Sequence, residues 1–254
     1  MLKIRHLSCV SGKKTLISGV SLDLSHGSLW GVVGPNGAGK TSLLRAIAGL
    51  IPVVSGEIIW DDTSLHAKSR QEISKIVTFV PQQPPLQFDF QVKEVVAMGR
   101  YSHTRNYHNE WDNIMEALEA VDMIHHADSL INELSSGERQ RVYIARALVS
   151  CAPIVLLDEP TASLDIRHQL EIWDLLLQLR DQQRTVIVTH HDLAAAYKYC
   201  RQIVVMHNGQ CVAQGPTNMT LTPSLVEEVF GVTPIGNSNQ SSFRLADKSC
   251  SMGR

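Results

Sequence analysis

The segment "GVVGPNGAGKTSLLRAIAGL" (residues 31–50) constrains the fold of this chain more than any other. It fits the pattern G-x-x-x-x-G-K-[ST] at Gly34, Gly39, Lys40 and Thr41, between the strand-like "LWGVV" and a stretch of helical period. Glycines at these positions let backbone amides turn inward, and the N-terminus of the following helix adds positive potential. A chance glycine-rich turn is the alternative, but the flanking elements favour a loop that holds phosphate groups.

Two side chains of the phosphate loop have predicted roles in nucleotide binding. We expect Lys40 to reach the β- and γ-phosphates of a nucleotide and Thr41 to ligate Mg²⁺. The residues predicted to surround the nucleotide are Gly34, Pro35, Asn36, Gly37, Ala38, Gly39, Lys40, Thr41 and Ser42.

Two carboxylates follow a second strand-like run, "IVLLDEP". A nucleotide hydrolase needs acidic groups at the end of a strand beside the phosphate loop. Asp158 is predicted to hold the Mg²⁺ shell, and Glu159 is predicted to polarise the attacking water, a role worth about 10²–10⁴-fold in rate. The alternative is a strand that simply ends in acidic turn residues before Pro160.

A pair of histidines ends a third strand-like run, "TVIVTHHDL". A histidine there can donate to a γ-phosphate. Adjacent residues of a strand point in opposite directions, so only one of His190 and His191 is expected to face a nucleotide. The other is expected to pack or to lie on the surface.

The order of these runs predicts the fold class. Continuous apolar runs alternate with stretches of helical period, which indicates an α/β fold with a mostly parallel sheet covered on both faces. Between Phe90 and Ser150 no strand-like run occurs and apolar residues recur at intervals of three and four, which predicts a helical insertion. The proline-rich "VPQQPP" (residues 80–85) predicts a hinge between the two parts.

Charge and cysteine content exclude several classes of protein. The formal net charge is −2 and no run of lysine and arginine occurs, so nucleic acid is not an expected partner. The five cysteines are scattered and form no C-x-x-C pair, which predicts reduced thiols rather than disulfides or a zinc site. No apolar run approaches the ~18–20 residues that span a bilayer, so we expect a membrane role to require a partner.

Taken in order, the phosphate loop, Gln82, "LSSGERQRVYIARAL", "IVLLDEPTASLD" and "VTHHDL" resemble the ATP-binding subunits of ABC transporters over roughly residues 2–230. The resemblance implies a P-loop core with an N-terminal antiparallel β portion and an inserted helical subdomain. It implies that Gln82 contacts Mg²⁺ and water, that Asp165 lies at a subunit interface, and that His191 is the switch histidine. From the residues alone, the simpler interpretation of Asp165 is a cap for a helix beginning near Ile166. The implied boundaries are a nucleotide-binding core at 1–85 and 151–230, a helical subdomain at 86–150, and a polar, mobile tail at 231–254.

The segment "LSSGERQ" (residues 134–140, hereafter the signature segment) carries two interpretations that are compatible. Ser135 and Glu138 have the spacing of a capping box, which starts a helix. The family resemblance implies that members pair head to tail, and that this segment closes over the ATP of the second copy. A helix N-terminus with free amides is a physically reasonable clamp for a γ-phosphate. The resemblance therefore adds Ser135, Ser136, Gly137, Glu138 and Asp165 to the nucleotide-contacting residues.

Two positions depart from the family pattern. Ser11 or Val10 stands where such chains often carry an aromatic residue that stacks on adenine, which predicts weaker affinity or looser base selectivity. Ser136 stands where glycine is usual. Its hydroxyl either substitutes by bonding a phosphate oxygen or its side chain slows closure.

The helical insertion indicates a branch of the family. The segment "VVAMGRYSH" (residues 95–103) resembles the ATPases of iron–siderophore, haem and cobalamin importers, with manganese or zinc importers and a soluble iron–sulfur assembly ATPase as alternatives. Core packing alone explains Val95, Val96 and Met98, but not the Arg100, Tyr101 and His103 that follow. The resemblance implies two membrane permease subunits docked here, a second copy of the chain, a substrate-binding protein, and a location on the cytoplasmic face of the inner membrane.

Overall fold

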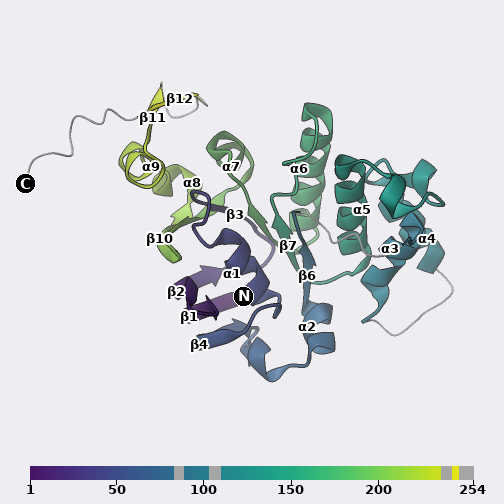
Figure 1. Cartoon of the computed structure of the whole chain (residues 1–254), viewed down its shortest axis with the longest axis horizontal. Coiled ribbons are helices and arrows are strands. Elements are labelled where there is room, and N and C mark those ends of the chain that lie inside the picture. The colour runs from purple at the N-terminus through teal and green to yellow at the C-terminus, as the bar shows by residue number, and fades with distance from the viewer. Residues whose placement is uncertain (83–88, 103–109, 236–241, 246–254) are drawn as a thin grey trace, which may run out of the picture.

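The computed structural model describes residues 1–82, 89–102, 110–235 and 242–245 (Figure 1). For residues 234–235 and 242–245 the structure describes the backbone alone. The fold is α/β, with a mostly parallel sheet, an antiparallel sheet and a group of helices at one side of the molecule.

The central sheet has the strand order β10-β9-β3-β8-β7-β6, and only its edge strand β10 runs antiparallel to its neighbour. Its middle strands are the continuous apolar runs of the sequence, because both faces are covered and every residue of β3, β7 and β8 is buried. The predicted parallel sheet is thereby confirmed. Its strands are β3 (Leu29–Val33), β6 (Val77–Val80), β7 (Ile154–Asp158), β8 (Thr185–Thr189), β9 (Gln202–His207) and β10 (Gln210–Pro216).

The N-terminal antiparallel portion is also confirmed. It has the order β2-β1-β4-β5, and its long strands alternate buried and exposed residues, as expected when one face packs on a core. That core is shared with α1 (Lys40–Ile47), which lies between the two sheets (Figure 1). The strands are β1 (Leu2–Ser11), β2 (Lys14–Leu24), β4 (Val53–Trp60) and β5 (Thr63–Ser64).

Between β6 and β7 the described residues contain helices and one isolated bridge, so the helical insertion is confirmed. Its helices share a hydrophobic core with α6 (Ile166–Asp181) and with the outer face of the central sheet, which fixes the insertion against the α/β core. The helices are α3 (Val92–Ala97), η2 (Met98–Arg100), α4 (Glu110–Glu119), η3 (Ile124–His126), η4 (Ile131–Glu133) and α5 (Ser136–Val149). The predicted hinge at 80–85 lies largely outside the described residues.

The remaining helices complete the cover of the sheets. They are η1 (Leu65–Ala67), α2 (Arg70–Ile76), α7 (Leu193–Tyr199), α8 (Thr217–Thr220) and α9 (Pro223–Phe230). After α9, β11 (Val232–Ile235) pairs antiparallel with β12 (Ser242–Leu245). Within the predicted polar tail, β11 and β12 therefore form a two-stranded antiparallel pair, which was not predicted from the sequence. Within the described ranges, no helix has the length and apolar character needed to cross a bilayer.

Candidate functional site

The phosphate loop lies between β3 and α1, and its glycines are required by close contacts as well as by backbone angles. A Cβ at Gly34 would lie 2.1 Å from the carbonyl oxygen of Met206, and a Cβ at Gly39 would lie 2.9 Å from that of Leu16. Gly39 also has φ of +99°, where a side chain is strained. Gly37, with φ of +80°, has open space on its Cβ side. The loop is therefore packed from behind and open on one side, as a phosphate cradle must be.

Lys40 lies inside this loop rather than in solvent. Its side chain is only 6% exposed, and Nζ donates to the carbonyl oxygens of Gly34 at 2.7 Å and Pro35 at 3.1 Å. Burial lowers the pKa of Lys40, and the negative charges of Glu159 and Asp158 partly oppose that effect. A buried ammonium close to two carboxylates is placed to attract and neutralise phosphate oxygens.

Oxygen atoms of the kind that bind metal ions lie together at the start of α1 and the end of β7. The hydroxyl of Thr41 donates to Oδ1 of Asp158 at 3.0 Å, and the hydroxyl of Thr189 donates to the same oxygen at 2.8 Å. Gln82 lies nearby, because its Nε2 donates to Glu159, the residue after Asp158. Carboxylate, hydroxyl and amide oxygens are the hard ligands that Mg²⁺ prefers when substrate phosphates complete its shell, so the residues present fit that ion. Among described residues, no group of three His, Cys, Asp or Glu side chains forms a further metal site.

Glu159 is surrounded by the two other polar side chains predicted to act with it. Nε2 of Gln82 donates to Oε2 of Glu159 at 2.8 Å, and Nδ1 of His191 lies 3.6 Å from the same oxygen. The backbone N–H of Glu159 donates to Thr189 Oγ1 at 2.8 Å, and its φ of +46° is uncommon for a residue other than glycine. Thr189 thus fixes the backbone of Glu159 and Gln82 bonds its carboxylate, and the positive φ is of a kind that occurs at functional sites.

The two histidines point to different environments, as expected for adjacent residues at the end of a strand. His191 is exposed beside Glu159, whereas His190 is buried against Trp173, with ring centroids 5.5 Å apart. Nδ1 of His190 accepts from the backbone N–H of Asp192, so Nε2 carries the proton and donates to Thr161 Oγ1 at 3.0 Å. Burial lowers the pKa of His190, which keeps the ring neutral.

The signature segment begins a helix as predicted. The backbone N–H of Glu138 donates to Ser135 Oγ at 3.3 Å, and Glu138 Oε2 accepts from the Ser135 backbone N–H at 2.7 Å, which forms the capping box. Ser136 is the first helical residue and is exposed, and no hydrogen bond of its side chain occurs within the described residues. A Cβ at Gly137 would lie 3.1 Å from the carbonyl oxygen of Ser163, so this helix start packs closely on the loop before α6.

Asp165 caps the next helix. Its Oδ1 accepts from the backbone N–H of His168 at 2.9 Å and lies 2.9 Å from Nδ1 of the same residue. These two bonds are the main reason that the pKa of Asp165 is lowered. The structure thus brings Lys40, Thr41, Gln82, Asp158, Glu159 and His191 together. In the described part of the chain, no hydrogen bond joins Ser135–Glu138 or Asp165 to the phosphate loop.

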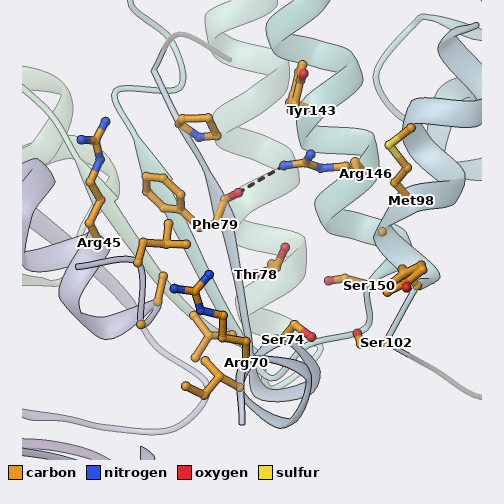
Figure 2. Close-up of a pocket in the computed structure, with 18 of the residues that line it drawn as sticks. Arg45, Arg70, Ser74, Thr78, Phe79, Met98, Ser102, Tyr143, Arg146 and Ser150 are labelled. Atoms are coloured by element: carbon orange, nitrogen blue, oxygen red, sulfur yellow. Dashed lines mark hydrogen bonds between the residues drawn. The ribbon is translucent and has the colours of Figure 1, made fainter. Parts of the chain in front are cut away.

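A groove lies between the α/β core and the helical insertion, with a cavity volume of about 700 Å³ (Figure 2). Arg45 of α1 and Arg70 of α2 line its core side, Met98 lines the other side, and Nη2 of Arg146 reaches from α5 to the carbonyl oxygen of Phe79 at 3.5 Å. Among the described residues that line the groove, none carries a carboxylate.

The segment after α3 supplies one rim of the groove. Val95 and Val96 are buried in the core of the helical insertion, but Met98 is 43% exposed and Tyr101 is 85% exposed. Arg100 donates to the carbonyl oxygen of Val149. Core packing therefore explains the two valines and leaves Met98 and Tyr101 on the surface. His103 lies outside the described residues.

Several residues of the site were not found by sequence reasoning. Thr189 orients both Asp158 and the backbone of Glu159, and Thr161 holds His190. Arg146 joins the signature helix to the strand that leads to Gln82. The sequence does show a hydroxyl residue, Thr189, at the end of a strand-like run. It indicates a site residue only once β8 is known to lie beside β7, the strand that carries Asp158.

A phosphate loop after β3, a lysine inside it, and carboxylates at the end of a parallel strand nearby define a nucleotide-binding protein of the P-loop class. The model of the ABC transporter family matches residues 17–162, more than half of the chain. The chain therefore belongs to the ABC transporter family.

Individual relatives agree with this family. The chain is 39% identical to a cobalamin import ATP-binding protein of Halobacterium salinarum over 85% of its own length, but it spans only 55% of that relative. It is 37% identical to a hemin import ATP-binding protein of Pseudomonas entomophila, over 91% of the chain and 93% of the relative. Among solved structures, a dimeric bacterial ABC transporter cassette has a TM-score of 0.77 at 26% identity, covering 85% of this chain and 99% of that one.

Proposed function

We propose that this chain is the ATP-hydrolysing subunit of an ABC importer and drives the uptake of an iron complex, such as a siderophore or haem, or of cobalamin. The observation that carries the proposal is the cluster around Glu159, in which Gln82 and His191 flank a carboxylate at the mouth of the phosphate loop. Relatives named for cobalamin and hemin import support the substrate class.

Hydrolysis follows from the geometry of the cluster. Glu159 accepts a proton from the attacking water, while Gln82 orients the carboxylate and the water by its amide. Lys40 neutralises charge on the β- and γ-phosphates, and His191 donates to the γ-phosphate and so registers its presence. Thr41, Asp158 and Gln82 would hold Mg²⁺, which supplies charge neutralisation at the phosphates when bound.

A second copy completes each ATP site in the proposed mechanism. The exposed N-terminus of α5, capped by Ser135 and Glu138, presents free amides and the Ser136 hydroxyl to the ATP of a head-to-tail partner. Asp165 lies at the interface. The dimeric cassette among the similar solved structures supports this pairing. We also propose that residues 1–230 form one cassette domain, with 86–150 as its helical subdomain and 231–254 as its tail.

The groove is the proposed docking site for two permease subunits, one on each copy. It combines exposed apolar side chains at Met98 and Tyr101 with arginines that lack carboxylate neighbours in the groove, which suits a short helix of a membrane protein. Arg146 connects this groove to Phe79, three residues before Gln82, so docking there can bias the position of Gln82. The chain would lie peripherally on the cytoplasmic face of the inner membrane, with a substrate-binding protein in the complex.

Purification from membranes tests the proposed function as a whole. Tagged chain recovered from detergent-solubilised membranes should carry a polytopic permease, and a strain that lacks the gene should lose uptake of labelled ferric siderophore, hemin or cobalamin. Loss of manganese or zinc uptake alone would favour the alternative importers. Recovery without any membrane protein, with all uptake intact, would contradict transport and favour a soluble ATPase.

Truncation of the exposed tyrosine at the groove tests the docking site. Tyr101→Ala is expected to reduce permease recovery and uptake by about tenfold or more, because exposed aromatic anchors dominate interface energies. Trp111→Ala is the matched control, since Trp111 is 54% exposed on α4 and does not line the groove. Equal recovery of permease by both variants would exclude this part of the groove as the docking site. Melting curves verify that each variant is folded.

A further inference from the structure

The loop of residues 161–165 connects the carboxylate site to the signature helix. It begins two residues after Glu159, whose carbonyl oxygen accepts from the backbone N–H of Ala162 at 3.2 Å. Its first side chain, Thr161, is buried and bonds His190, the neighbour of His191. The start of the 161–165 loop is therefore tied to the residues that surround the γ-phosphate position.

The far end of the same loop lies against the signature helix. A Cβ added to Gly137 would lie 3.1 Å from the carbonyl oxygen of Ser163 and 3.2 Å from Cδ2 of Leu164, so any side chain there would displace the loop. Arg141, one turn further along α5, contributes to the lowered pKa of Asp165 by its charge. The 161–165 loop is therefore in close contact with the N-terminus of α5.

Two adjacent side chains of α6 hold this loop. Nε2 of Gln169 donates to the carbonyl oxygens of Leu164 at 2.9 Å and Thr161 at 3.2 Å, which closes the loop across its base. His168 binds the carboxylate of Asp165 by both its backbone N–H and its ring. Among the described residues, the side chains of Gln169 and His168 form no hydrogen bond to the phosphate loop.

We propose that Gln169 and His168 are positioning residues that keep the 161–165 loop in one conformation, so that it couples Glu159 and His191 to the signature segment of the same chain. This inference rests on the proposed head-to-tail pairing, in which that segment serves the ATP of the second copy. When these hydrogen bonds fix the loop, binding or hydrolysis of ATP at one site changes the position of the signature segment at the other site. When the bonds are lost, each site still binds ATP, but the two sites close independently.

A substitution can remove the hydrogen bonds that Nε2 of Gln169 donates without changing the size of the side chain. Gln169→Glu keeps the shape of the side chain but replaces the N–H donor with an oxygen that repels the carbonyls of Thr161 and Leu164. Gln169→Leu removes the donor without adding charge. Gln178→Glu is the matched control, because Gln178 is exposed on the same helix and its side chain forms no hydrogen bond with described residues.

The experiment measures ATP hydrolysis against ATP concentration for the full chain. Both Gln169 variants should lose about tenfold to a hundredfold in kcat and shift the Hill coefficient toward one, with unchanged Kd for ATP in the monomer, because misplacement of a catalytic partner lowers turnover rather than binding. Hydrogen exchange of the amides at 161–165 should accelerate in both variants. The control should match the wild type in every measurement.

Two results would overturn the inference. One is wild-type kcat and cooperativity in both Gln169 variants. The other is a loss of kcat with an equal loss of ATP affinity, which would show a general structural role instead. A wild-type chain that neither hydrolyses ATP nor pairs would instead contradict the proposed function, so the two failures are distinguishable.

Discussion

Glu159→Gln should bind ATP normally and hydrolyse it about 10²–10⁴-fold more slowly than the wild type, because the general base is lost while the shape of the site is kept. The glutamine oxygen can still accept from Nε2 of Gln82, and the backbone N–H can still donate to Thr189. Single-turnover hydrolysis and equilibrium ATP binding measure the two effects separately.

The same variant should accumulate as an ATP-bound dimer. If Ser135–Glu138 of one copy closes over the ATP of the other, opening must await hydrolysis, so blocked hydrolysis should trap the closed pair. Size-exclusion chromatography with ATP and Mg²⁺ detects it. Glu227→Gln, an exposed change of the same kind on α9, should hydrolyse ATP at the wild-type rate and stay monomeric under the same conditions. Hydrolysis by Glu159→Gln at a rate near that of the wild type would remove Glu159 from the role of base.

The parts of the site that the sequence predicts are those whose residues lie close together in the chain. The phosphate loop is contiguous, so the spacing of its glycines and of Lys40 reveals it without knowledge of the fold. Asp158 ends a buried strand and Glu159 follows it, and parallel strands that end at one edge of a sheet bring such residues together. The capping box at Ser135 is likewise local, since its two hydrogen bonds join residues three apart.

The rest depends on contacts between distant segments. Gln82 was assigned only through family resemblance, because a glutamine in a loop has no local signature until Glu159 is placed beside it. Thr189 acts on the carboxylate of Asp158, which lies 31 residues away in the sequence and is brought into reach by the pairing of β7 with β8. The strand β12 was missed because it has only four residues and is paired with β11, and the sequence does not show that these two segments are neighbours.

Lys40→Ala should abolish tight nucleotide binding. The ammonium is buried inside the loop, and a hydrogen bond to a charged group contributes about 1.5–3 kcal/mol. Loss of contacts to two phosphates corresponds to an affinity at least about a hundredfold weaker. Fluorescence titration with an ATP analogue measures this, and melting curves show whether the loop still folds. Lys75→Ala, an exposed lysine in α2, is the control and should bind normally.

The double variant Lys40→Ala with Glu159→Gln separates binding from closure. If Lys40 acts on the phosphates, the double variant should fail to form the ATP-dependent dimer that Glu159→Gln alone accumulates, because no γ-phosphate is held for Ser135–Glu138 of the second copy to contact. A dimer that still forms at the same ATP concentration would show that pairing does not require a nucleotide in the phosphate loop. Unchanged ATP affinity in Lys40→Ala itself would refute the assignment of residues 34–41 as the phosphate site.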